Sequence, residues 1–67
     1  MDNNYIIQKI RKMYIDYGVN VAFLDALDDE RKIKGMKGIL AELDLKKKHD
    51  YTPEDSKFIR KIYSMFC

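Results

Sequence analysis

The longest apolar repeat in the chain lies between residues 29 and 48, and its spacing limits the possible folds more than any other feature. Apolar side chains recur there at intervals of three and four residues: Ile33, Met36, Leu40 and Leu43. This spacing forms one stripe on a helix, whereas a half-buried strand alternates every two residues. Acidic residues come just before the repeat and three lysines close it, an order that the helix dipole favours. We therefore predict a helix over residues 29–48.

Two glycines interrupt this repeat. Gly35 and Gly38 each cost about 1 kcal/mol relative to alanine in a helix interior. They could allow a neighbouring backbone to approach closely, or they could break the segment into two shorter helices around residues 34–38. The GxxG pattern is also the form of the loop that clamps a nucleic-acid backbone in KH domains. That loop needs flanking strands, whereas the flanks here are predicted to be helical. Close backbone approach and a break around residues 34–38 are both left open, and the first is favoured.

Two helices are predicted before this segment, over residues 4–17 and 20–27. The first would be capped by Asn3 or Asn4 and would end at Gly18, since glycine adopts the left-handed conformation after a helix without strain. The second would be capped by Asn20. Its apolar side chains do not line up with those of residues 29–48, so we expect a turn near residue 28.

The strongest local pattern predicts a last helix over residues 53–66. Thr52 suits the N-cap, Pro53 suits the first helical position, and Glu54 and Asp55 complement the dipole in the first turn. Asp55 stands where a capping box usually has a longer acidic or amide side chain. We therefore predict the cap by Thr52 without the reciprocal bond from Asp55.

These predictions describe an all-α fold, a small three- to four-helix bundle in a single domain spanning residues 1–67. A chain of 67 residues buries about 60% of its extended surface. Besides the central repeat, the side chains expected in the core are Ile6, Ile7, Ile10, Met13, Tyr14, Tyr17, Phe23, Leu24, Leu27, Phe58, Ile59, Ile62, Met65 and Phe66.

The composition favours a protein without catalytic groups, metal or cofactor. His49 is the single histidine and Cys67 the single cysteine, so a zinc site and an internal disulfide are not expected. We expect Cys67 to be an exposed terminal thiol. Neither a signal peptide nor an apolar run of about 20 residues is present. The expected location is the cytoplasm, with no membrane partner and no small-molecule substrate.

Charge is unevenly distributed along the chain. The formal net charge is +2, yet residues 31–48 hold seven cationic residues against two acidic ones, and residues 22–30 hold four acidic residues and no cation. Basic side chains and an aromatic residue in this region are candidates for contacts with a protein partner or with phosphates. The candidate site residues are Lys32, Lys34, Lys37, Lys46, Lys47, Lys48 and Tyr51.

Two functions are consistent with these observations. The first is a small non-enzymatic adaptor or inhibitor that docks on a larger protein, a type common among regulators encoded by phages and mobile elements. Its small size, many aromatic residues and polarised charge favour this hypothesis. The alternative is a nucleic-acid-binding module that uses the basic face around Lys32–Lys48 on phosphates.

Overall fold

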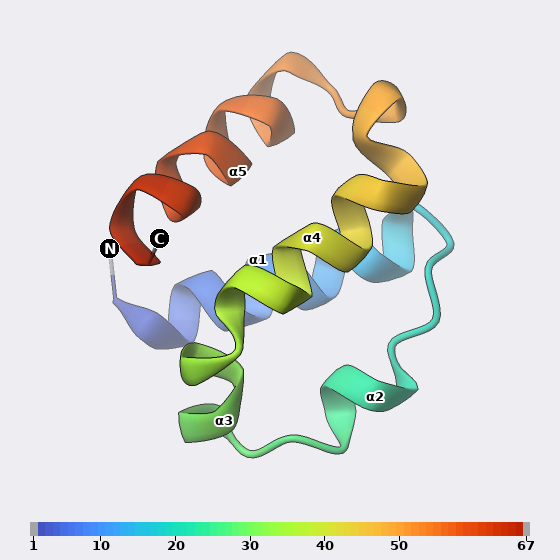
Figure 1. Ribbon diagram of the computed structural model, residues 1–67. Helices are drawn as coiled ribbons and strands as arrows, with labels where there is room; N and C mark the ends of the chain where they lie inside the picture. The colour runs from blue at the N-terminus through green and yellow to red at the C-terminus, as the bar shows by residue number, and fades with distance from the viewer. Residues whose placement is uncertain (1, 67) are drawn as a thin grey trace.

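The computed structural model describes residues 2–66, and all regular structure in that range is helical (Figure 1). The all-α prediction is therefore confirmed. Cys67 lies outside the described residues. The elements in order are α1 (Asn3–Asp16), α2 (Ala22–Asp25), α3 (Asp29–Lys34), α4 (Met36–Lys47), the 3₁₀ turn η1 (Lys48–Asp50) and α5 (Pro53–Phe66).

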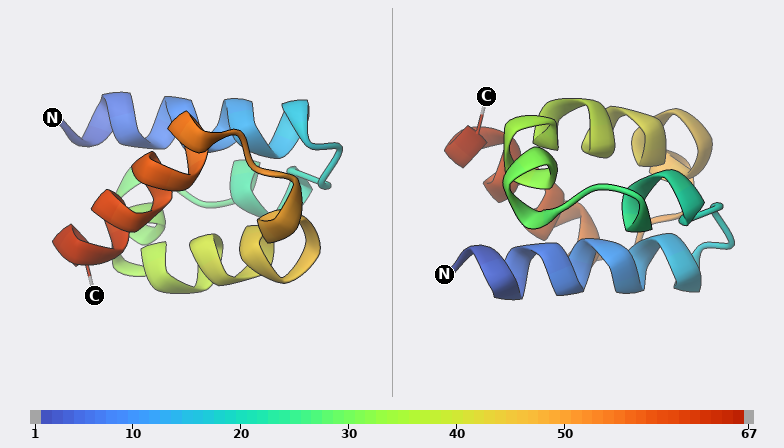
Figure 2. Two further views of the ribbon diagram at one scale, coloured as in Figure 1. Left: turned by 90° about the horizontal axis from the view of Figure 1, so that it is seen from above. Right: turned by 90° about the horizontal axis from the view of Figure 1, so that it is seen from below.

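The three longer helices enclose the core. Figure 2 shows α1 and α4 side by side, with α5 lying across both of them. The short helices α2 and α3 complete the other side of the bundle, where the chain crosses from α1 to α4 (Figures 1 and 2). The buried side chains come mainly from facing stripes of α1, α4 and α5. This is the arrangement expected when several amphipathic helices share one interior.

Most side chains predicted to face inward do so. Ile6, Leu40, Leu43 and Ile62 are completely buried, so the apolar spacing identified the inner faces of the three long helices. Four other predicted core residues lie only at the edge of the core: Tyr17, Leu27, Ile33 and Phe66.

Two predictions of core residues are wrong. Phe23 is 43% exposed and Met65 is 48% exposed. Phe23 lies on a helix of only four residues, and its ring packs against Tyr14 at a centroid distance of 5.7 Å. Met65 lies in the last turn of α5. Both side chains rest on the outside of the core because these elements are too short, or too close to their end, to be covered on two sides.

The ends of α1 are set by Asp2 and Gly18. The Asp2 carboxylate accepts a hydrogen bond from the Tyr5 N–H at 2.8 Å, so the cap lies one residue before the predicted Asn3. At the other end Gly18 has a φ of 75°, as predicted. The N–H groups of Gly18 and Val19 donate to the carbonyls of Ile15 and Tyr14, which is the hydrogen-bond pattern of a Schellman motif.

The central segment is broken at Gly35, so the prediction of one helix over residues 29–48 is wrong. Gly35 is both the C-cap of α3 and the N-cap of α4. The interpretation of close backbone approach is wrong at Gly38, where an added Cβ would have no neighbour within 4 Å, whereas a Cβ on Gly35 would lie 3.2 Å from the Arg31 carbonyl oxygen of the preceding turn. The KH-type loop is excluded because residues 2–66 contain no strand. The low helix propensity of glycine makes Gly35 the least costly place to change direction.

The second predicted helix, over residues 20–27, is reduced to the single turn of α2. Its N-cap is Val21, which makes no side-chain hydrogen bond, so the predicted cap at Asn20 is wrong. The Asn20 side chain instead accepts from the Ala22 N–H at 2.8 Å, a local turn that competes with helix. The segment is held to α1 by Arg11, whose guanidinium donates two hydrogen bonds to Asp25, and by buried Leu24.

The last helix has the predicted bounds and the predicted cap. Thr52 Oγ1 accepts from the Asp55 N–H at 3.1 Å. The Asp55 carboxylate makes no return bond to the Thr52 N–H. The Tyr17 hydroxyl lies between the two groups, accepting from the Thr52 N–H at 3.1 Å and donating to Asp55 Oδ2 at 2.7 Å. A residue of α1 therefore completes the cap of α5.

Within residues 2–66, none of the helices combines the length and the apolar composition needed to cross a bilayer.

Candidate functional site

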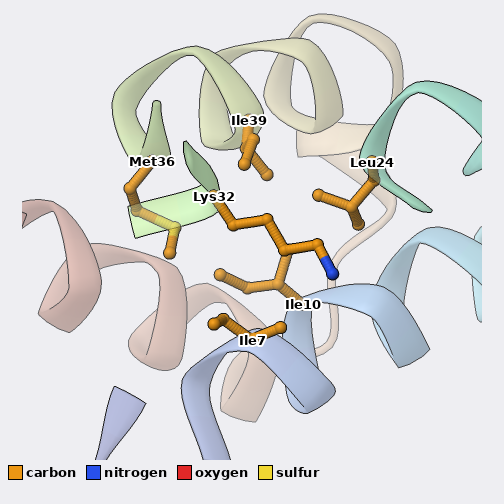
Figure 3. A pocket seen from close by; sticks show the side chains of 6 residues that line it. All are labelled: Ile7, Ile10, Leu24, Lys32, Met36 and Ile39. Atoms are coloured by element: carbon orange, nitrogen blue, oxygen red, sulfur yellow. The ribbon is translucent and has the colours of Figure 1, made fainter. Parts of the chain in front are cut away.

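Lys32, the first of the predicted site residues, is part of the packing. Its side chain is only 13% exposed. Figure 3 shows it stretched across an apolar pocket that leaves no room for water. Its Nζ lies 3.7 Å from Asp29 Oδ1. Long cationic side chains often cover apolar surface with their methylene groups in this way. The pocket is lined by Lys32 together with Ile7, Ile10, Leu24, Met36 and Ile39.

Lys34 and Lys46 are exposed but paired on their own helices. The Nζ of Lys34 lies 3.0 Å from Glu30, and the Nζ of Lys46 lies 3.0 Å from Glu42. Each pair joins residues four positions apart, a spacing that favours such contacts on a helix surface. The charges of these two lysines are therefore largely balanced by their neighbours.

The lysines of α4 do not form one basic face. An α-helix turns by about 100° per residue, so Lys37 and Lys46 lie on opposite sides of α4. Lys47 is half-buried, and Lys48 begins the 3₁₀ turn. The sequence prediction grouped these residues by their proximity along the chain, whereas the helix distributes them around its axis.

A different set of basic residues emerges from the ion pairs. Seven of the 13 lysines and arginines have an acidic partner within 4.0 Å. The other six have no ion-pair partner within residues 2–66, and all six lie on α4, η1 or α5. We call these six residues the unpaired basic set: Lys37, Lys47, Lys48, Lys57, Arg60 and Lys61.

Three members of the unpaired basic set were not among the predicted site residues: Lys57, Arg60 and Lys61. They are exposed on α5. A sequence pattern could have found two of them, because neither Arg60 nor Lys61 has an acidic residue three or four positions away. Lys34 and Lys46 both have one, and both are paired.

A carboxylate and two tyrosines join α4, the following loop and α5. Asp44 accepts hydrogen bonds from the hydroxyls of Tyr51 and Tyr63. The Tyr51 ring also packs edge-on against Tyr17, with a centroid distance of 5.4 Å. Burial, followed by the bond to Asp44, raises the pKa of Tyr51 well above its usual range, so its hydroxyl stays protonated as a donor. The predicted site residue Tyr51 therefore turns its polar end inward.

Beside this network lies a hollow of about 190 Å³ between the end of α4 and α5. Asp44, Tyr51 and Tyr63 line one part of it, and Lys48, Ser56 and Arg60 line the rest, with Ile59 also in contact. Here the structure brings together Lys48 and Tyr51, which were both predicted site residues, with Arg60, which was not.

The exposed apolar side chains are scattered. Tyr5 and Ile15 lie on α1, Phe23 on α2, Leu45 on α4 and Met65 on α5. Leu45 is the most exposed of these side chains, at 83%. Isolated exposed apolar residues are ordinary in soluble folds, so none of them defines a site alone.

No group of three or more potential metal-ligating side chains is gathered within residues 2–66. Comparison of the chain with protein-family models, with curated proteins and with solved structures found no match.

Proposed function

We propose that this chain is a small non-enzymatic interaction protein, an adaptor or inhibitor, that docks on an acidic surface of a larger protein. The docking surface is built from α4, η1 and α5. The observation that carries this proposal is the location of the unpaired basic set, whose six residues all lie on these elements while every other cation has an acidic partner.

A cluster of unpaired positive charges suits recognition of an acidic protein surface. Complementary potentials speed association and orient the two partners. Residues 2–30 carry a net charge of −3 and residues 31–66 a net charge of +5. An acidic partner would therefore be attracted to residues 31–66 and repelled by residues 2–30. Leu45 and Met65 lie on the same two helices as the cations and offer apolar contact. The proposed compartment is the cytoplasm, since a single cysteine cannot form an internal disulfide framework.

Nucleic-acid binding is the alternative occupant of this surface. Sequence-tolerant binders of single strands combine a cationic groove with exposed aromatic rings. The aromatic residues that line the hollow with Lys48 and Arg60 are Tyr51 and Tyr63, which are both partly buried and bonded to Asp44. The net charge of +2 is also small for a surface that must hold several phosphates. These observations favour a protein partner.

The test compares two triple variants of equal charge. In the first, Lys57, Arg60 and Lys61 are all replaced by glutamine. In the control, Lys12, Arg31 and Lys34 are replaced by glutamine, since these cations are also exposed but each has an acidic partner. The full chain is immobilised on a resin and incubated with an extract of its cell of origin. The partner protein that it recovers is purified, and its binding to each variant is measured by calorimetry. We expect affinity to fall at least about tenfold in the first variant and to stay near that of the parent in the control.

Two results would overturn the proposal. One is recovery of no stoichiometric protein partner. The other is tight binding of fluorescent single- or double-stranded oligonucleotides that weakens with salt by about one logarithmic unit per neutralised phosphate. Equal losses in the two triple variants would show that the surface of α4, η1 and α5 is not the docking site.

A further inference from the structure

We infer that the hollow between η1 and α5 receives one acidic side chain, an aspartate or glutamate of the protein partner, between Lys48 and Arg60. This inference rests on the proposed docking function and names the recognition site within it. The hollow is the one of about 190 Å³ described above, and its occupant is a carboxylate group.

The charges around the hollow favour a single anion. Lys48 and Arg60 both line it, and neither has an ion-pair partner within the described part of the chain. The Asp44 carboxylate also lines it, yet this carboxylate accepts hydrogen bonds from Tyr51 and Tyr63. Two cations therefore face the hollow against one carboxylate, and a monoanion would balance the site.

The available donors match a carboxylate. A guanidinium presents a planar pair of N–H groups that can bind both carboxylate oxygens, and such charge-assisted bonds are stronger than neutral ones. Lys48 adds a second positive charge, and the Ser56 hydroxyl on the same wall can donate a further bond. Binding pockets for small organic molecules typically enclose about 300–1,000 Å³, so this smaller hollow suits one side chain of a larger partner.

The wall of the hollow is fixed before a partner arrives. Both tyrosine hydroxyls are directed at Asp44, and the Tyr51 ring is held against Tyr17. Tyr17 is in turn bonded within the N-terminal cap of α5. A site with its walls already ordered loses less entropy on binding. The Asp44 charge in this wall repels a chain of phosphates more strongly than it repels one carboxylate, which favours a protein over a nucleic acid.

The experiment titrates the ¹⁵N-labelled full chain with a capped octaglutamate peptide and, separately, with octathymidylate, at one low ionic strength. We expect the peptide to shift the amide resonances of Ser56, Arg60 and Tyr63. Lys48→Gln and Arg60→Gln should each weaken peptide binding about fivefold, the effect of losing one partly exposed charge pair. Lys12→Gln is the matched control, because Lys12 is exposed on α1 and paired with Asp16, and the peptide affinity of this variant should change less than about twofold.

Each other outcome would overturn the inference. Equal weakening by Lys12→Gln would mean that the chain attracts acidic peptides diffusely, which removes the hollow as the recognition site and leaves the docking function to the recovery experiment. Tighter binding of octathymidylate, with the same dependence on Lys48 and Arg60, would assign the hollow to phosphates. Peptide binding that is absent at low salt would also reject the carboxylate, whereas the recovery experiment above decides the docking function independently.

Discussion

The Tyr17 hydroxyl accepts the hydrogen bond from the N-cap N–H that a glutamate or glutamine accepts in an ordinary capping box. In that motif the third helical residue bonds back to the N-cap N–H. Here Asp55 holds that position, and the Tyr17 hydroxyl bridges it to the Thr52 N–H. Lys9 Nζ also lies 3.7 Å from the Asp55 carboxylate. Both oxygens of the Asp55 carboxylate therefore contact α1, Oδ1 through Lys9 and Oδ2 through Tyr17.

Tyr17→Phe should destabilise the protein by about 1–2 kcal/mol, because it removes one hydroxyl that makes two hydrogen bonds and leaves the Thr52 N–H without its acceptor. Urea unfolding followed by circular dichroism measures the change. Tyr5→Phe is the matched control, since Tyr5 is 51% exposed and its hydroxyl makes no hydrogen bond within residues 2–66. Equal midpoints for the two variants would contradict the role assigned to Tyr17.

Tyr14 makes the corresponding link between α1 and α4. It is completely buried, and its hydroxyl donates to the Ile39 carbonyl at 2.6 Å. Burial, the larger cause, and the charge of Glu42 raise the pKa of Tyr14 far above its ordinary value of 10.0. The folded protein therefore keeps this hydroxyl protonated at pH values where the unfolded chain has begun to lose the proton.

This difference predicts a loss of stability in alkali. A group whose pKa is higher in the folded state contributes its full stability below the unfolded pKa and loses that contribution as the pH rises above it. Above pH 10, Tyr14 should lower the free energy of unfolding by up to about 1.4 kcal/mol per pH unit. Urea titrations between pH 9 and 11.5 measure the slope, and Tyr14→Phe should have the shallower one. Parallel slopes would show that Tyr14 ionises normally in the folded state.

At the scale of the elements, Gly35 decides how many helices the centre of the chain forms. The Gly35 N–H donates to the Arg31 carbonyl at 2.8 Å and its own carbonyl accepts from Ile39 at 3.0 Å, so the hydrogen bonds of both helices meet at this residue. The apolar spacing of residues 33–43 continues through the break, which is why the spacing alone predicted a single helix. Local conformation at one glycine overrode that pattern.

The other two glycines predict opposite effects when they are replaced by alanine. Gly38 lies inside α4, is exposed and has space for a Cβ, so Gly38→Ala should stabilise the protein by up to about 1 kcal/mol. Gly18 has a φ of 75°, where a Cβ is strained, so Gly18→Ala should destabilise it by about 1 kcal/mol. Thermal unfolding measures both. A destabilising Gly38→Ala would indicate a close neighbour that the structure does not contain.

For the whole molecule, stability depends on the interior shared by α1, α4 and α5. Ile62 of α5 is completely buried, as are Leu40 and Leu43 of α4 and Ile6 of α1. A domain of this size has a small margin of stability. Any unpaired charge placed in this interior costs several kcal/mol, which is comparable with the whole free energy of unfolding.

Ile62→Asp should therefore unfold the domain. Leu45→Asp is the matched control, because Leu45 is 83% exposed on α4 and the same change there should alter stability by no more than about 0.5 kcal/mol. Circular dichroism at 222 nm, compared across a thermal scan, distinguishes the two. Cooperative melting of Ile62→Asp near the parent temperature would show that α5 does not depend on this contact.

Local sequence patterns were sufficient to predict the helical class, the inner faces of the long helices and the start of α5. Each of these depends on residues within about one helical turn of one another, through apolar spacing, capping side chains or glycine. Local spacing therefore predicted the buried positions of Ile10, Leu40 and Ile62 and the cap at Thr52.

Which basic residues are unpaired, and which side chains lie together, depends instead on how the helices pack. The Lys32 side chain lies over packed side chains of α1, α2 and α4. Arg60 of α5 and Lys48 of η1 line the same hollow. Both results depend on how helices distant in sequence are oriented against one another. Spacing along a chain carries no information on that orientation, because it fixes which side of a helix a residue occupies but not what stands opposite.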